Sequence, residues 1–232
     1  MFKIIKDIEN CVSRYYLFSQ EAIISRKIRK IRGTKTCCDL GCGDGAMMSR
    51  LKKFNMGMES SLGIDIHFPT LRELKNRNIY RWVVCADLRN LPLKDGAFDV
   101  AIASHVVEHI EKEDDILSQL ERVCKSLLIV GVPRGVTKFS PHEEEEENVY
   151  QRHKSGYEVK DFKDLGYSVY GFGARFICNR IYKEGKIPII FRPGFSLASQ
   201  LFTAFTYFVP GIADCFISLK YKGLEHAKRY EK

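Results

Sequence analysis

The sequence predicts an α/β fold in which a mostly parallel sheet carries helices on both faces. After Gly33, apolar strand-like runs alternate with helix-like segments. The strand-like runs are continuously apolar, as expected for strands buried on both faces. Three of them end in an acid, which indicates that one edge of the sheet gathers polar side chains.

A length of 232 residues fits one large α/β domain or two small ones, and a composition of 45% apolar and 28% charged residues is ordinary for a soluble globular protein. The net charge of +8 favours a lysine-rich surface over a dedicated polyanion site. Eight cysteines form no C-x-x-C pair and mostly lie in apolar runs, so we expect buried thiols in a reducing compartment. No signal peptide or spanning helix is apparent, and a cytoplasmic location is the expectation.

The elements follow in order from hydrophobic spacing. Residues 2–31 have helical spacing, with basic side chains for which we favour a solvated helix face over contact with phosphate or anionic lipid. Strands are predicted at residues 35–40, 61–66, 80–86, 98–104, 126–132, 167–172 and 213–221. Helices are predicted at residues 46–54, 70–76, 113–124, 157–165 and 195–208. Residues 133–153 are expected to form a loop over the strand ends.

The first strand leads into three glycines at alternate positions, Gly41, Gly43 and Gly45. Glycine has no Cβ, so a ligand can lie directly against the main chain. The helix that follows offers free N–H groups and the positive end of its dipole. This segment predicts a site for a nucleotide-like cofactor.

Acids end the first three strands, at Asp39, Asp65 and Asp87. Asp65 lies 24 residues after Gly41, where a carboxylate can accept both hydroxyls of a ribose. Asp87 could accept the exocyclic amine of an adenine. A single acid at the end of a strand is explained by ordinary capping of the strand. Three such acids at the same edge of the sheet favour a cofactor site.

The glycine spacing distinguishes between cofactors. Dinucleotide folds use G-x-G-x-x-G, whereas this chain has G-x-G-x-G with Asp44 where a pyrophosphate would lie. Acidic surroundings suit a cofactor that carries an amino acid and a sulfonium charge. The pattern therefore favours S-adenosylmethionine over NAD.

Four stretches in order resemble the successive motifs of class I S-adenosylmethionine-dependent methyltransferases, most closely the ubiquinone/menaquinone-type small-molecule branch. These stretches are residues 39–45, 63–65, 86–93 and 98–109, and the resemblance covers about residues 35–132. It implies a Rossmann-like seven-stranded sheet whose last strand is antiparallel. The chain shows no internal repeat and no low-complexity linker, so we expect one domain, with a helical cap at 1–33, a cofactor-binding core at 34–132 and acceptor-side segments at 133–232.

The resemblance implies a role for each site residue. Ser104 would line the cofactor, while His105 would face the acceptor. The residues expected to contact the methionine part of the cofactor are Asp39, Gly41, Cys42 and Gly43. Those expected to contact its ribose and adenine are Asp65, Ile66, Asp87 and Leu88. Residues 177–208 resemble an insertion that shapes the acceptor pocket. Its aromatics suit a flat or lipid-like acceptor, and ordinary helix packing explains them equally.

Methyl transfer needs a general base only where the acceptor must lose a proton, and His105, then His153, are the candidates. No metal is expected for this function. The alternative is a metal-dependent RNA 2′-O-methyltransferase, similar to those acting on small-RNA 3′ ends, with ligands from His105, Glu108 and His109 plus His142 or His153. A non-catalytic S-adenosylmethionine binder and a peripheral membrane contact through residues 195–208 also stay open.

Overall fold

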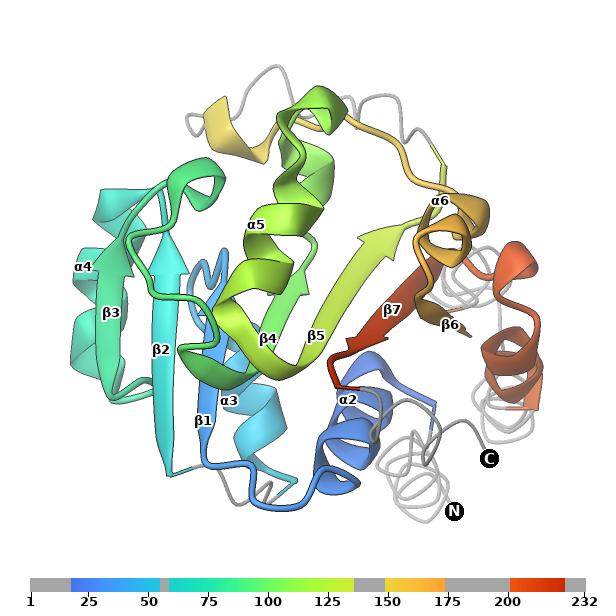
Figure 1. Ribbon diagram of the computed structural model, residues 1–232, viewed down its shortest axis with the longest axis horizontal. Coiled ribbons are helices and arrows are strands. Elements are labelled where there is room, and N and C mark those ends of the chain that lie inside the picture. Colours follow the sequence, from blue (N-terminus) through green and yellow to red (C-terminus); the bar gives the residue numbers. More distant parts are fainter. Residues whose placement is uncertain (1–17, 55–58, 136–148, 174–200, 224–232) are drawn as a thin grey trace, which may run out of the picture.

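The computed structural model describes residues 18–54, 59–135, 149–173 and 201–223 of the chain. Within these ranges a seven-stranded sheet has the order β3-β2-β1-β4-β5-β7-β6 (Figure 1). Strands β1 to β5 run parallel, and β7 is antiparallel to both β5 and β6. This confirms the predicted fold class. The strands are β1 (Thr36–Leu40), β2 (Ser60–Asp65), β3 (Trp82–Cys85), β4 (Phe98–Ser104), β5 (Cys124–Pro133), β6 (Ser168–Phe172) and β7 (Cys215–Tyr221).

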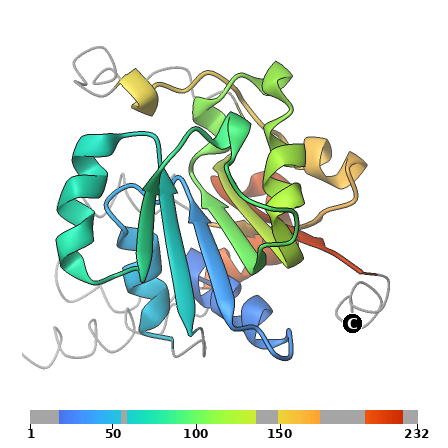
Figure 2. The same cartoon turned by 60° about the vertical axis from the view of Figure 1, so that its left-hand side comes forward.

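Helices cover both faces of this sheet, as the turned view in Figure 2 shows. Helices α5 and α6 pack on one face, and α2 and α3 on the other. The helices are α2 (Gln20–Arg29), α3 (Ala46–Lys52), α4 (Phe68–Leu74), α5 (Ile116–Val123) and α6 (Val159–Asp164). Residues 201–208 are also helical, and short 3₁₀ helices include η2 (Leu88–Asn90), η3 (Val107–His109), η4 (Lys112–Asp114) and η5 (Val149–Gln151).

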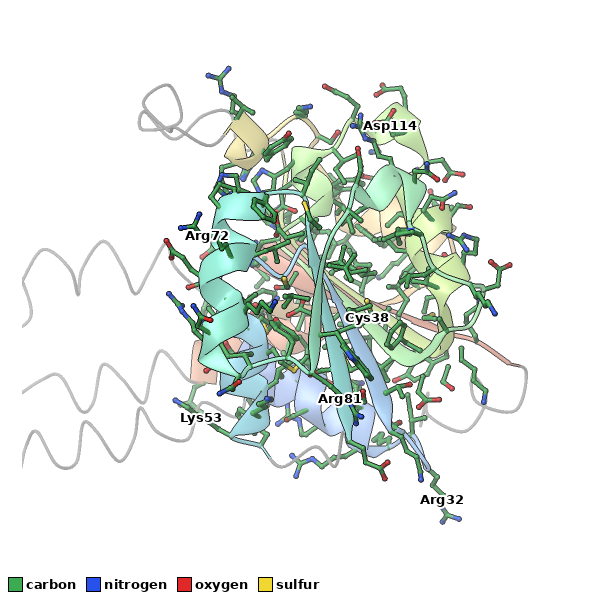
Figure 3. The ribbon with its side chains drawn as sticks, turned by 90° about the vertical axis from the view of Figure 1, so that its left-hand side faces the viewer. Arg32, Cys38, Lys53, Arg72, Arg81 and Asp114 are labelled. Atoms are coloured by element: carbon green, nitrogen blue, oxygen red, sulfur yellow. The ribbon has the colours of Figure 1, made fainter. Side chains whose placement is uncertain are left out.

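Neighbouring residues along a strand enter opposite cores, because side chains alternate across a sheet. Cys38 belongs to the core under α5, whereas Cys37 belongs to the core under α2 and α3. Figure 3 shows Cys38 in the interior and Arg32 and Arg72 at the periphery. Both faces of the central strands are therefore buried, which explains their continuously apolar sequence.

Several predicted bounds of helices and strands differ from those in the structure. The third strand spans Trp82–Cys85, shorter than the predicted 80–86. Helix α5 begins only at Ile116, because Asp115 has a left-handed φ of 46° and follows a 3₁₀ turn. Strand β5 begins at Cys124, a residue predicted as helical, and runs through Pro133, which was predicted to open the loop.

The N-terminal helix is shorter than predicted within the described residues, and one of its lysines is not solvated. Helix α2 starts after Ser19, whose hydroxyl accepts the Ala22 N–H. Lys27 is buried, with its ammonium 3.6 Å from the centre of the Tyr170 ring, a cation–π geometry. The prediction of a solvated face holds for Arg29 but is wrong for Lys27.

Other predictions fall partly or wholly outside the described residues. Most of the predicted 177–208 insertion and all of residues 136–148 belong to this group. Among the described residues, no helix combines the length and apolarity needed to cross a bilayer.

Candidate active site

The glycine loop after β1 is fixed against the end of β2. The N–H groups of Gly41 and Cys42 both donate to the carbonyl of Ile64, at 2.7 and 2.8 Å. Gly41 has a φ of 75°, and a Cβ there would lie 2.4 Å from Cγ2 of Val106. Gly43 also has a positive φ, 49°, but a Cβ there would meet no atom within 4 Å. The loop therefore presents bare backbone to open space at Gly43.

Asp65, at the end of β2, holds this loop directly. One carboxylate oxygen accepts the Gly43 N–H at 2.8 Å, and the other accepts the His67 N–H at 2.9 Å. Each carboxylate oxygen has a second lone pair, so the group can accept two further hydrogen bonds. The predicted juxtaposition of the loop and the second acid is thus present.

Asp39 lies buried behind the loop, where it accepts a hydrogen bond from the Tyr80 hydroxyl. Burial raises the pKa of Asp39 to about 6; the Tyr80 hydrogen bond opposes the rise, and the nearby Asp65 charge adds to it. Burial likewise raises the pKa of the Tyr80 phenol. Sequence reasoning missed Tyr80, which is 41 residues from its partner.

Asp87 follows β3 and caps η2 by accepting the Arg89 N–H. The Arg89 guanidinium also pairs with this carboxylate, with Nη2 2.6 Å from Oδ2. Those hydrogen bonds hold the pKa of Asp87 below its usual value. Asp87 is therefore ionised at neutral pH, but part of its capacity to accept hydrogen bonds is already used.

The end of β4 brings Ser104 and His105 to the same edge. The Ser104 hydroxyl accepts a hydrogen bond from Nε2 of Gln20 at 2.7 Å, so α2 contributes to the site. His105 has a φ of 57°, a conformation that non-glycine residues rarely adopt and that clusters at functional sites. Its N–H donates to the Gly131 carbonyl at 2.7 Å, which fixes this turn.

A cavity of about 860 Å³ opens at this edge. Its size lies toward the upper end of small-molecule pockets, about 300–1,000 Å³. Asp114, which also lines it, lies in Figure 3 at the opposite end of the molecule from Arg32, the end where the parallel strands finish. Every cofactor residue predicted from the sequence lines the cavity, and so does His105: Asp39, Gly41, Cys42, Gly43, Asp65, Ile66, Asp87, Leu88 and Ser104.

Other lining residues were not predicted. They come from the start of α2 and the residues just before it, from η5 and the residues just after it, and from the end of β6, and they include Phe18, Gln20, Tyr150, Lys154 and Phe172. A serine before a helix signals the start of α2, but no local pattern shows that this helix borders a pocket. These positions depend on the tertiary fold.

His153, the second predicted base, does not line the cavity. It lies instead beside His109, with ring centres 4.8 Å apart, and His109 does line the cavity. Glu108, His109 and His153 offer ligand-type atoms that all lie within 4.8 Å of one another. Of the alternative metal set, His142 lies outside the described residues.

Comparisons with known proteins agree with this geometry. Residues 38–128 match the family described as a methyltransferase domain. An uncharacterised protein from Methanocaldococcus jannaschii is 29% identical over 187 residues, which cover 77% of each chain. A probable S-adenosylmethionine-dependent methyltransferase from Mycobacterium tuberculosis is 25% identical over 137 residues, covering 58% of this chain and 47% of that protein.

Solved structures share the fold. Phosphoethanolamine N-methyltransferase 2 from Haemonchus contortus, in complex with S-adenosylmethionine, has a TM-score of 0.54 at 16% identity. The match covers 88% of this chain and 52% of that chain. The family match spans the glycine loop and the acids that end β2 and β3, which are the residues gathered at the cavity. Over residues 38–128 the chain is similar to a methyltransferase domain, and over 137 residues it is similar to a probable S-adenosylmethionine-dependent methyltransferase.

Proposed function

We propose that the cavity binds S-adenosylmethionine along the carboxyl edge of the sheet and that the methyl group goes to a small-molecule acceptor. One observation supports this more than any other: the bare backbone at Gly43 and the Asp65 carboxylate are hydrogen-bonded together on the cavity wall. Hydrogen-bond acceptors and space for a ligand therefore lie side by side.

The residues present suit this cofactor. Open space beside Gly43 accommodates the methionine part, and the remaining lone pairs of Asp65 accept the ribose hydroxyls. Asp39, with a pKa of about 6, is mostly ionised at pH 7 and attracts cationic groups. Asp87 and Leu88 border the adenine. Ile66, Cys42, Gly41 and Ser104 complete the wall.

Bound S-adenosylmethionine supplies an electrophilic methyl group. The protein contributes orientation and proximity, which account for much of the acceleration in such reactions. For an acceptor that must lose a proton, His105 is the base, because its ring lies in the cavity wall. Its Nδ1 lies 3.3 Å from Oε1 of the buried Glu108 carboxylate.

The acceptor enters from the side formed by the segments after β5. Tyr150 and Phe172 line that side of the cavity and suit a flat or lipid-like molecule. We propose the ubiquinone/menaquinone-type branch for this reason, with residues 34–132 forming the cofactor core of a single domain and residues 133–232 the acceptor side.

A second candidate is methylation of an RNA 2′-hydroxyl. It is favoured by one observation, that three residues of the predicted ligand set, Glu108, His109 and His153, lie together, although His105 is not part of that group. The acceptor class can be tested by incubating the protein with tritiated S-adenosylmethionine and either a metabolite extract or total RNA. We expect label in material that passes a small-pore ultrafilter; label released only by ribonuclease would instead favour RNA.

A further inference from the structure

The Asp39 carboxylate is a buried negative charge on the wall of the cavity. The residue is only 2% exposed, and it lines the cavity behind the glycine loop. Burying a carboxylate is costly unless hydrogen-bond donors or cations compensate the charge. Among the described residues, the Tyr80 hydroxyl is the one hydrogen-bond donor to this group, with its oxygen 2.5 Å from Oδ2. The question is what this tyrosine does for the site.

No cation compensates the charge in the part of the chain that the structure describes. Neither Asp39 nor Asp65 forms an ion pair with a lysine, arginine or histidine there. The neighbouring strands place Gly63 and Ile102 beside Asp39, and neither residue carries a charge. Burial and, as a smaller effect, the Asp65 charge raise the pKa of Asp39. A cationic group of a ligand in the cavity would compensate both carboxylates.

The fold leaves room for the Tyr80 ring at the expense of two side chains. A Cβ at Gly63 would lie 3.0 Å from Cδ2 of Tyr80, and a Cβ at Gly45 would lie 3.3 Å from its Cε2. The ring therefore packs against two glycines, one in β2 and one in the glycine loop. Tyr80 does not line the cavity itself, so it can act on a ligand only through Asp39.

We propose that Tyr80 is a positioning residue, which keeps the Asp39 carboxylate charged to receive the ammonium group of the cofactor's amino-acid part. A hydrogen bond to the charged form of a carboxylate favours that form, so the Tyr80 hydroxyl opposes the effect of burial on the pKa of Asp39. Because this pKa is about 6, Asp39 keeps most of its charge at pH 7. The inference rests on the proposed function, since it places the amino-acid part beside the glycine loop.

The other groups around Asp39 do not change charge near neutral pH. Three thiols interact electrostatically with it, those of Cys37, Cys38 and Cys42. Burial and the Asp39 charge raise the pKa of each thiol above its ordinary value, so the thiols are neutral at pH 8.5 and below. Burial also raises the pKa of the Tyr80 phenol, so its hydroxyl stays a donor over the same range. The Asp65 charge is common to the parent and every variant below.

The experiment is calorimetric titration of the full-length protein with S-adenosylhomocysteine at pH 6.5 and pH 8.5. We expect Tyr80→Phe, which removes only the hydroxyl, to bind at least about fivefold more weakly than the parent at pH 6.5, since a hydrogen bond to a charged group changes an equilibrium roughly tenfold or more. At pH 8.5 the carboxylate is ionised in both proteins, so the two affinities should agree within about twofold. Comparison at one pH cancels the titration of the ligand's own amino group.

Matched controls separate this role from a general loss of stability. Tyr167→Phe also removes a tyrosine hydroxyl that donates to a carboxylate, Oε1 of Glu121, outside the cavity lining. It should bind like the parent at both pH values. Because 5′-methylthioadenosine lacks the amino-acid part, Tyr80→Phe should bind that ligand as the parent does at pH 6.5. Asp39→Asn has no charge to preserve, so adding Tyr80→Phe to it should change the affinity by less than about twofold.

The outcomes distinguish this inference from the proposed function. Equal losses in Tyr80→Phe at both pH values, no loss at pH 6.5, or the same loss for 5′-methylthioadenosine would overturn the role of Tyr80 and leave cofactor binding in place. A parent protein that binds S-adenosylhomocysteine at neither pH would overturn the proposed function, and the role of Tyr80 with it.

Discussion

Replacing Asp65 with alanine should damage cofactor binding more than it damages the fold. The carboxylate accepts two backbone N–H groups, from Gly43 and His67, and we propose that it also accepts two ribose hydroxyls. Hydrogen bonds to a charged group contribute about 1.5–3 kcal/mol each. Loss of two ribose contacts would cost at least about 3 kcal/mol, which is a loss of affinity of roughly 100-fold or more.

The fold should lose less. Two backbone donors without their acceptor cost about 1 kcal/mol each, so the total is about 2 kcal/mol. For a chain of this size, that lowers the melting temperature by about 4–8 °C. Asp65→Asn keeps one neutral acceptor oxygen and should fall between the parent and Asp65→Ala in both properties.

The assay is calorimetric titration with S-adenosylhomocysteine at a temperature well below the melting point of each variant. Asp95→Ala is the matched control, because Asp95 is 80% exposed and pairs with Arg122. It should bind as the parent does. Affinity within twofold of the parent in folded Asp65→Ala would refute the role of this carboxylate in holding the ribose.

Three further predictions concern the glycine loop and Asp39, the acid that precedes it. Gly43→Val should abolish S-adenosylhomocysteine binding in calorimetry, because the valine side chain would enter open cavity space. Circular dichroism should show that the variant is folded. Retained binding would show that the cofactor does not lie against Gly43. Urea titrations should show that Gly41→Ala lowers the free energy of unfolding by about 2 kcal/mol more than Gly33→Ala does. Both glycines have a positive φ, but only Gly41 lies against Val106. Equal losses in the two variants would contradict this contact. The folded pKa of Asp39, about 6, exceeds its ordinary 3.8, so its protonation adds stability that is complete below about pH 4 and is lost as the pH rises through 6. Urea titrations from pH 4 to 7 should show this loss in the parent and less of it in Asp39→Asn, whereas identical profiles would refute it.

The sequence was most informative where structure is local. The first strand, the glycine loop and the acid that ends β2 are each encoded within a few residues, and the parallel arrangement then brings their ends to one edge. For that reason the predicted cofactor residues could be named before their contacts were known. The antiparallel position of β7 came from resemblance to a family, since no local pattern specifies strand order.

The remaining features depend on contacts between distant segments. The Gln20 side chain reaches Ser104 across 84 positions, and Tyr80 reaches Asp39 across 41. Neither residue carries a local signal for such a contact. The position of His153 likewise depends on a distant contact, because its segment hydrogen-bonds to the backbone at Glu108 and its ring lies beside His109, outside the cavity lining.

A crystal structure of the protein soaked with S-adenosylhomocysteine tests the account most directly. We predict electron density with both ribose hydroxyls on the Asp65 carboxylate, the adenine beside Leu88 and the amino-acid part against Gly43. Density for this ligand at any other surface, or an unchanged cavity at saturating ligand, would contradict it.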